Sequence, residues 1–419
     1  MRRLAAAETL RRHLQRHGAD LEEATLGPCE GPKGLGIYAR RAIAKGEVVA
    51  SVPRGLVLEA PLLGTAAPPS DTLLAAAAGG HGQWYDVLGS GSGRRSAVKL
   101  AQRLVEEEKK GQKSPWASYL HALPQPIPAL HPLANAWPME LLRCSPFLAR
   151  LYEEAEHCHA QCLSLAPESD KSDEQRFRRA LSAVITRNFA LQGPALALLP
   201  FLDFFNHRSA MRRGSIDWTC SFHERHGSVA MVADRFIAAG EELSFVYVSA
   251  PDAVLLVQYA MAPEVLGNLH NMAGVQVFPD DVGAVWEEKW RVLKQWGWNG
   301  HAPLLFTVPD ALFPGAALRR LAELLAAEDC EAIAGVCAAA QSRGRRRRHS
   351  SSAAAVRLLL SWLQRARRRL AMPDVSIDST HQELRRAVAA VVEGEARVLE
   401  VCLEQLETEA LLAELKAVA

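Results

Sequence analysis

The sequence predicts an α+β protein in which small β-sheets, interrupted by a helical insertion, are followed by an all-helical domain. Three observations predict this class. Short β-type runs lie near the N-terminus and return from Trp218 onward, helical patterns fill the segment between them, and helical stripes continue beyond Asn268. With 419 residues the chain is too long for one ordinary hydrophobic core, so two or three domains are expected.

The first β segment follows an N-terminal helix. Residues 8–17 have a helical pattern, and Gly18 can adopt the left-handed conformation that ends a helix. Between Gly34 and Leu58 two β-type runs, GIYARRAI and EVVASVP, are joined by a turn at Lys45-Gly46. Pro, Gly and Ser then accumulate over residues 61–93, which predicts a flexible loop. A phosphate-binding loop is disfavoured, because neither Lys-Ser nor Lys-Thr follows the glycines.

Helical patterns predict the insertion, and alternating apolar residues predict the return of the β unit. The helical patterns cover residues 97–105, 138–165 and 173–189. The alternating positions are Trp218, Cys220, Phe222, Val229, Met231, Leu243, Phe245 and Tyr247.

Two apolar stripes predict the C-terminal helical domain. One stripe runs from Leu318 to Leu325 and the other from Leu384 to Leu406, both at helical spacing. Between them lies SRGRRRRHSSS, which is typical of a solvated charged loop. Its alternative interpretation is a nuclear-localisation signal or a patch that binds an anionic surface.

Composition excludes several classes of protein. A formal charge of +1, with 49% hydrophobic and 23% charged residues, is typical neither of a disordered chain nor of a dedicated nucleic-acid binder. The 8 cysteines form no CxxC pair, no secretory leader is evident, and no run approaches the roughly 20 apolar residues of a membrane span. The Arg-rich N-terminus contains acids, unlike a transit peptide. We therefore expect a protein of the cytoplasm, the nucleus or both.

One apolar stretch, LLPFLDFFNH, contains polar residues that need an explanation. Asp203 interrupts a run of Leu, Pro and Phe, which then closes on Asn206 and His207. Burying an unpaired polar side chain costs about 1 to 3 kcal/mol, so the fold must supply partners. The partners could be backbone groups or a bound ligand.

The order of these segments resembles one family. KGLGIYARRAIAKGEVVASVP, SPWASYLHALP, AWPMELLRCSP, VITRNF, PFLDFFNH and GEELSFVYVSAPDAVLLVQYAMAPEVLGN are together similar to segments of the SET-domain methyltransferases of the Rubisco large-subunit lysine methyltransferase type. This branch includes the actin histidine methyltransferases. The resemblance implies small β-sheets with a knot-like closure, a rare exception to unthreaded connections. It also implies a C-terminal helical domain that binds part of the protein substrate.

The resemblance implies a division of the chain into four parts. Residues 1–75 would hold the N-terminal helix and the first SET segment, and residues 76–180 the helical insertion. Residues 181–262 would form the second SET segment with the cofactor and catalytic motifs. Residues 263–419 would form the substrate-binding domain.

The resemblance also implies an S-adenosylmethionine site. Tyr247 would be catalytic, its phenol fixed beside the transferred methyl group. Phe189, Trp218 and Tyr259 would line the substrate channel; an aromatic residue at position 189 favours lysine over histidine as the nucleophile. The residues expected to bind the cofactor are Lys33, Gly34, Leu35, Gly36, Arg187, Asp203, Phe204, Phe205, Asn206 and His207.

The sequence departs from the family around the catalytic tyrosine. The family reads Ser-Tyr-Gly, then Ser-Asn, then Tyr-Gly-Phe; here the chain has Val248 after Tyr247, then Pro251-Asp252, then Ala260 after Tyr259. If the family glycine has a positive φ, Val248 is costly there and the loop runs differently. Two alternatives therefore stay open beside a lysine methyltransferase: a SET-fold binding scaffold without activity, and a histidine methyltransferase.

Two further partner classes are disfavoured. The balanced net charge argues against a nucleic-acid partner bound through residues 345–348. In EHCHAQC, Cys158 and Cys162 share a helix face, but His157 and His159 lie on others, so no metal is expected. The cysteine-rich zinc segment that follows the SET domain in many histone methyltransferases has no counterpart, which favours a non-histone substrate. We expect a monomer without membrane contact.

Overall fold

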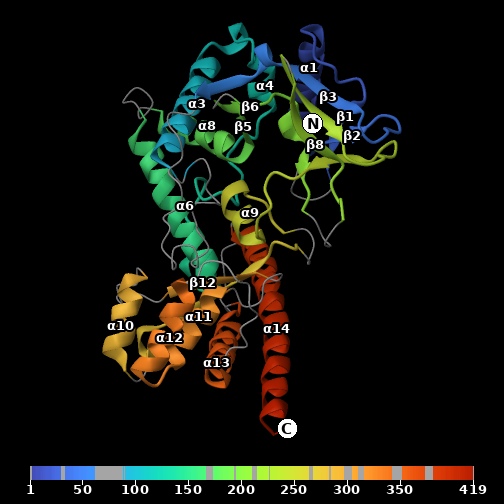
Figure 1. The fold of residues 1–419 in the computed structure, drawn as a ribbon. Helices are drawn as coiled ribbons and strands as arrows, with labels where there is room; N and C mark the ends of the chain where they lie inside the picture. Colours follow the sequence, from blue (N-terminus) through green and yellow to red (C-terminus); the bar gives the residue numbers. More distant parts are fainter. Residues whose placement is uncertain are drawn as a thin grey trace.

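The fold is described from a computed structural model of the chain. Lys33 and the arginines at 345–348 lie outside the described residues. The described ranges are 2–29, 34–61, 88, 90–166, 173–192, 195–209, 215–225, 227–263, 268–282, 285–296, 304–309, 316–341, 352–372 and 381–418. Figure 1 shows small sheets at one end, a mainly helical C-terminal region at the other, and helix α14 (Gln382–Val418) extending away from helix α9 (Asp252–Tyr259).

The N-terminal half contains small sheets built from strands that are distant in the sequence. Their strand orders are β1-β2-β10-β7, β3-β9-β8 and β4-β6-β5. The strand bounds are β1 Ala24–Pro28, β2 Leu35–Ala39, β3 Val48–Pro53, β4 Leu58–Pro61, β5 Asn188–Leu191, β6 Ala195–Leu198, β7 Asn206–His207, β8 Cys220–Arg225, β9 Ser228–Ala233 and β10 Glu242–Phe245. Strands β5 and β6 form a hairpin, and β5 takes up the last two residues, 188 and 189, of the predicted helical pattern.

One parallel pairing brings the two halves of the β unit together. In β7 and β10, Asn206 is paired with Ser244 and His207 with Phe245. On its other edge β10 pairs antiparallel with β2, where Leu243 faces Ile37. The segment that ends in Asn-His therefore lies directly beside the segment that leads to Tyr247.

Serine or aspartate side chains cap helices α3, α6 and α8. Ser90 accepts a hydrogen bond from the backbone of Gly93 at 3.0 Å, so the last glycines of the expected loop instead open helix α3. Ser145 caps α6 in the same way, at 2.9 Å from the amide of Leu148. The helix bounds in this half are α1 Arg2–Arg16, η2 Arg54–Leu56, α3 Gly91–Lys109, η4 Gly111–Lys113, α4 Ala117–Ala122, α5 Met139–Leu142, α6 Pro146–Ser164, α8 Glu174–Arg187 and η5 Leu202–Phe204.

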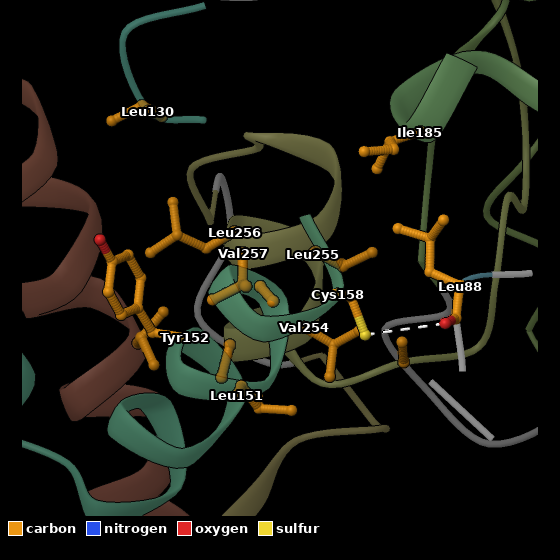
Figure 2. Close-up of a cluster of buried hydrophobic side chains, with 14 of the residues drawn as sticks. Leu88, Leu130, Leu151, Tyr152, Cys158, Ile185, Val254, Leu255, Leu256 and Val257 are labelled. Atoms are coloured by element: carbon orange, nitrogen blue, oxygen red, sulfur yellow. Dashed lines mark hydrogen bonds between the residues drawn. The ribbon is translucent and has the colours of Figure 1, made fainter. Parts of the chain in front are cut away.

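Helix α9, Asp252–Tyr259, is buried on nearly every side. Figure 2 shows Val254 to Val257 packed among Leu151 and Cys158 of α6 and Ile185 of α8. An apolar helix of this kind is stable only inside a core. The burial of α9 fixes the position of Tyr259, its last residue.

The C-terminal region is mainly helical and also contains a two-stranded sheet. Strand β11 buries Ala273, Gly274, Val275 and Val277, and it pairs antiparallel with β12. Only Val275-Gln276-Val277 alternates apolar and polar residues, and the prediction of a helical region passed over this short signal. The bounds are β11 Met272–Val277, η6 Pro279–Val282, α10 Trp286–Gln295, β12 Leu304–Pro309, α11 Ala316–Ala326, α12 Cys330–Gln341, α13 Ala353–Arg369 and α14 Gln382–Val418.

Buried acids lie where α14 packs on the N-terminal half. Glu395 of α14 is 2% exposed and accepts a hydrogen bond from Ser145 Oγ at 2.6 Å. Burial raises the pKa of Glu395 to about 8, against the hydrogen bond from Ser145. Asp252 of α9 accepts hydrogen bonds from Asn268 and Asn271, both at 2.8 Å. The first contact fastens α14 to α6, and the second ties α9 to the segment that leads into β11.

No helix among the described residues combines the length and the apolar character that crossing a bilayer requires.

Candidate active site

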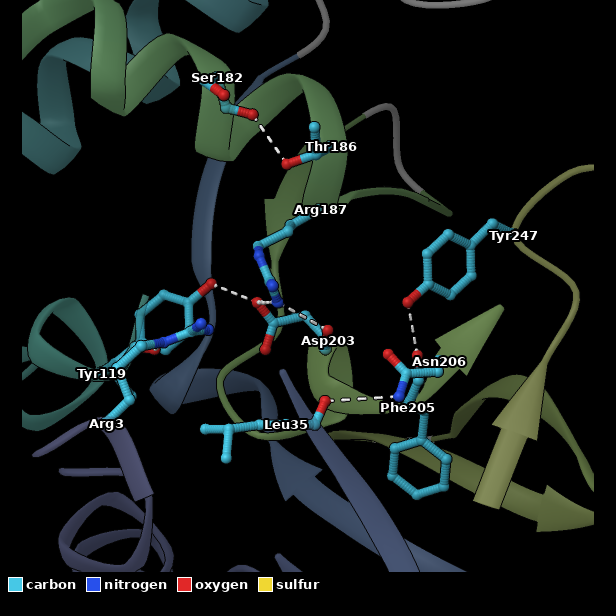
Figure 3. A network of polar contacts seen from close by, with 11 residues as sticks. Arg3, Leu35, Tyr119, Ser182, Thr186, Arg187, Asp203, Phe205, Asn206 and Tyr247 are labelled. Atoms are coloured by element: carbon cyan, nitrogen blue, oxygen red, sulfur yellow. Dashed lines mark hydrogen bonds and ion pairs between the residues drawn. The ribbon is translucent and has the colours of Figure 1, made fainter. Parts of the chain in front are cut away.

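Tyr247 is held by the segment that ends in Asn206-His207. The backbone N–H of Tyr247 donates to Nδ1 of His207 at 3.0 Å. The phenol donates to the carbonyl of Phe205 at 2.6 Å, as Figure 3 shows. Because Nδ1 accepts, the ring proton of His207 is on Nε2, 2.7 Å from Ser209 Oγ. Burial raises the pKa of Tyr247, so its phenol stays protonated at neutral pH.

A cavity of about 500 Å³ opens beside Tyr247. Its wall includes six residues that the sequence assigned to the site: Arg187, Phe189, Asp203, Trp218, Tyr247 and Tyr259. Aromatic rings dominate one side. Phe189 stacks on Phe245 with ring centroids 5.6 Å apart, and Tyr247 lies 5.8 Å from Tyr259. Residues from six stretches of the chain, between Thr186 and Tyr259, therefore enclose one aromatic space.

Asp203 has two partners inside the protein. Tyr119 donates to its Oδ2 at 2.8 Å, and Arg187 forms an ion pair with the same oxygen at 3.3 Å (Figure 3). Burial raises the pKa of Asp203, while Arg187 and Tyr119 oppose that effect. The other oxygen, Oδ1, is buried and has no hydrogen-bond partner among the described residues. The sequence had not identified Tyr119.

Asn206 contacts other protein groups at the edge of β2. Its Nδ2 donates to Glu242 Oε1 at 2.8 Å and to Cys29 Sγ at 3.1 Å. A Cβ on Gly36 would lie 2.3 Å from Cys29 Sγ and 2.9 Å from Asn206 Nδ2, so only glycine fits there. Gly34 has a φ of 78°, which also favours glycine.

The remaining residues assigned to the cofactor lie behind the cavity wall. Phe204 and Phe205 are buried, and Arg187 stacks over Phe204 at 5.3 Å. Leu35, also buried, accepts a hydrogen bond from Asn206 Nδ2 at 3.4 Å. None of Leu35, Phe204 and Phe205 lines the cavity. Phe204 contacts Arg187 and Phe205 contacts Tyr247, and both Arg187 and Tyr247 line it.

The strain expected at Val248 is absent. Among the described non-glycine residues, only Phe201, Ala260 and Val285 have a positive φ. The loop after Tyr247 thus accepts a β-branched residue. The left-handed position lies instead at Ala260, which ends α9 with a φ of 55°.

The sequence did not point to several polar residues of the cavity wall, among them Asp234, Ser221 and Gln258. Asp234 accepts hydrogen bonds from Trp218 Nε1 at 2.7 Å and from Ser221 Oγ at 2.8 Å. Gln258 precedes Tyr259, and its Oε1 is buried without a hydrogen-bond partner among the described residues. Asp234 and Ser221 lie at the end of β9 and inside β8, where no local pattern marks a site.

The histidines and cysteines of α6 form no metal cluster within the part of the chain that the structure describes. Burial raises the pKa values of the Cys158 and Cys162 thiols. His159 instead stacks on His131 with ring centroids 5.5 Å apart.

The three small sheets, the β7–β10 pairing and the aromatic cavity define the class of protein. A family model described as the SET domain matches residues 34–248, just over half of the chain. The chain therefore belongs to the SET-domain family, whose members are S-adenosylmethionine-dependent methyltransferases.

Solved structures of one enzyme share the whole fold. A crystal structure of the SET domain of LSMT bound to lysine and AdoHcy is 18% identical, with a TM-score of 0.62 over 97% of this chain and 92% of that chain. A structure of Rubisco LSMT bound to AdoMet is 17% identical, with the same TM-score and coverage. No curated protein sequence matches the chain. The likeness extends to the C-terminal helices, which lie outside the family match.

Proposed function

We propose that the protein transfers a methyl group from S-adenosylmethionine to a lysine side chain of a non-histone protein. The observation that carries the proposal is the fixed phenol of Tyr247 in the wall of an aromatic cavity. Tyr247 is held there by two hydrogen bonds, one from its backbone N–H to His207 and one from its phenol to the Phe205 carbonyl. LSMT, which shares the fold, has been crystallised with lysine and AdoHcy.

The residues present fit the cofactor. Two buried acceptor oxygens on the cavity wall, Asp203 Oδ1 and Gln258 Oε1, have no hydrogen-bond partner among the described residues. A ligand with ammonium or hydroxyl donors satisfies such acceptors. Arg187 offers a positive charge for a carboxylate, and we propose that Lys33, which lies outside the described residues, adds a second.

We further propose that the other predicted cofactor residues hold the nucleoside. Asn206 and His207 would contact the adenine, since Tyr247 and Glu242 orient both side chains. Gly34, Leu35 and Gly36 would offer backbone groups, and Phe204 and Phe205 would keep water from the site.

The aromatic wall supports lysine as the nucleophile. Phe189, Trp218 and Tyr259 offer ring faces to an aliphatic chain and its ammonium group. Phe189 stacks on Phe245 and contacts Phe222 at a tilt, and its phenyl ring has no N–H or O–H that could orient an imidazole. Burial in this apolar space favours the neutral amine, which is the form that reacts.

Tyr247 orients the reaction and does not act as a base. When bound, S-adenosylmethionine supplies an electrophilic methyl group. Because the phenol proton is donated to the Phe205 carbonyl, the phenol oxygen keeps lone pairs that can accept weak C–H contacts from that methyl. The raised pKa keeps the proton on Tyr247. Alignment and exclusion of water then lower the barrier.

We also propose the predicted division of labour along the chain. The helices of residues 263–419 would bind part of the protein substrate. The protein would act as a monomer in the cytoplasm, the nucleus or both.

Three measurements test the proposal. The purified protein is incubated with labelled S-adenosylmethionine and a proteome, and the modified residue is mapped; we expect lysine. Tyr247→Phe should lower turnover while cofactor affinity, measured by calorimetry, stays nearly unchanged. Asn206→Ala should weaken that affinity.

Each alternative has a distinct outcome. Cofactor binding without transfer to any protein would identify a scaffold. A mapped histidine would replace lysine as the nucleophile. Equal turnover of Tyr247→Phe would remove this residue from the mechanism.

A further inference from the structure

We propose that Asp234 is the binding site for a basic side chain next to the target lysine of the substrate, so that the enzyme selects positively charged sequences. The inference rests on the proposed function, because it names the substrate class of the same cavity. It concerns a residue of the cavity wall that the reaction itself does not need.

The carboxylate of Asp234 is held in place by neutral donors. Trp218 Nε1 donates to Oδ2 at 2.7 Å and Ser221 Oγ donates to Oδ1 at 2.8 Å. The backbone N–H of Asp234 donates to Thr219 O at 2.9 Å. Trp218, Ser221 and Asp234 all line the cavity. The hydrogen bonds fix the orientation of the carboxylate and leave its negative charge in place.

The charges of the cavity wall do not balance. Its charged residues are Arg187, Asp203 and Asp234, and the first two form an ion pair with each other at 3.3 Å. None of the described residues forms a salt bridge with Asp234; the neighbouring Arg235 instead pairs with Glu241 at 2.6 Å. The wall therefore carries one negative charge without a counterion in the described part of the chain.

The carboxylate has room for a cation. An ionised carboxylate has about four lone-pair positions, and the hydrogen bonds from Trp218 and Ser221 use two of them. A guanidinium or ammonium group can use the others. The nearest titratable group in this network is His223, whose Nε2 lies 2.9 Å from Ser221 Oγ on the exposed side of β8.

Asp234 lies at the rim of the cavity, whereas Asp203 lies inside it. Asp203 is 4% exposed, but Asp234 and Trp218 are half-buried, and Phe236 is 63% exposed two residues further on. Arg235 Nε donates to Trp218 O at 3.2 Å, which ties the two rim loops together. Ile216, in the same loop as Trp218, is 44% exposed. The rim thus offers apolar contacts beside one carboxylate, which fits a basic residue that flanks the target.

Binding is measured by calorimetry in the presence of S-adenosylhomocysteine, at low and at moderate salt. The probes are two synthetic peptides with one central lysine, flanked on both sides by arginine or by glutamate. The proteins are the wild type, Asp234→Asn, Asp234→Lys and the charge-preserving Asp234→Glu. The matched control is Asp217→Asn, which removes a carboxylate from the same loop as Trp218 without touching the cavity wall. Thermal unfolding and S-adenosylhomocysteine affinity report whether each variant is folded.

We expect the wild type to bind the arginine peptide about five- to tenfold tighter than the glutamate peptide, with a difference that shrinks as salt rises. Asp234→Asn should abolish the preference, Asp234→Lys should reverse it, and Asp234→Glu and Asp217→Asn should retain it. An unchanged preference in Asp234→Asn overturns the proposal, and so does the absence of a preference in the wild type. An equal loss of affinity for both peptides would mean that Asp234 binds the target lysine, and this result also overturns the proposal.

These results are separate from the test of methyl transfer. Peptide binding is measured without turnover, so a protein that fails to methylate can still show the charge preference. A protein that methylates lysine with no charge preference keeps the proposed function and loses this inference.

Discussion

Replacing Glu395 by glutamine should change how stability depends on pH. In the folded protein this side chain lies between Ser145 of α6 and the backbone of Gly274 in β11, and its Oε2 has no hydrogen-bond partner among the described residues. Asp252 lies close to the same turn of α14: its Oδ2 would be 3.7 Å from a Cβ added at Gly394. The surroundings thus disfavour ionisation of Glu395.

The magnitude follows from its two pKa values. The ordinary value is 4.5, and burial raises the pKa in the folded protein to about 8. Between these values the folded chain holds a proton that the unfolded chain has released, so the free energy of unfolding falls as pH rises. This contribution is fully present below pH 4.5 and is lost as pH rises toward 8. From pH 4.5 to 7 the loss amounts to about 3 kcal/mol.

Glu395→Gln keeps an acceptor oxygen for Ser145 and cannot ionise. Its stability relative to the wild type should therefore rise by about 3 kcal/mol between pH 4.5 and 7. Urea unfolding followed by circular dichroism measures this difference at intervals of pH. Glu393→Gln is the control, because Glu393 lies two residues earlier on α14 with its side chain 53% exposed. A difference between wild type and Glu395→Gln that stays constant with pH would refute the reasoning.

Three further changes test other parts of the fold. Ala260→Gly should stabilise the protein by about 1 kcal/mol, because the residue has a φ of 55°; Ala253→Gly, inside the same helix, should destabilise it. Differential calorimetry that ranks the two variants the other way would contradict this. Tyr119→Phe should cost about 1 to 3 kcal/mol in urea unfolding, since a buried carboxylate loses its donor. An unchanged free energy of unfolding in Tyr119→Phe would mean that water replaces the phenol. Burial lowers the pKa of His159 to about 4, so its contribution to stability is full above pH 6.5 and is lost as pH falls toward 4. His159→Phe keeps a ring beside His131 and should reduce this acid loss, measured as the melting temperature between pH 7 and 4; an unchanged slope would exclude His159 as its source.

Local sequence was enough to predict most elements but not their partners. The cap at Gly18, the runs that became β2 and β3, and the alternation of β8 to β10 depend on neighbouring residues, so their patterns are visible in the sequence. Strand β11 alternates over only three residues, Val275 to Val277, so the prediction of a helical region passed over it. The Gly-rich end of the expected loop became the first turn of α3 because Ser90 caps it.

At the site, too, the sequence predicted residues but not their partners. The polar stretch with Asp203 correctly raised the question of partners, but Tyr119 is 84 residues away and no spacing rule connects the two. The family resemblance supplied Tyr247 and the aromatic residues, which the structure places around one cavity. The sequence did not mark Asp234, because its proposed role depends on a negative charge that has no counterion among the nearby described residues.

The pairing of β2 with β10 has a consequence for how the protein is made. Tyr38 faces Glu242 across this ladder, about 200 residues later in the chain. At ribosomal speeds of about 5 to 20 residues per second, one edge of β2 waits roughly 10 to 40 seconds for its neighbour. During that delay the nascent chain exposes an unpaired strand edge, which is the feature that chaperones bind and aggregates grow from.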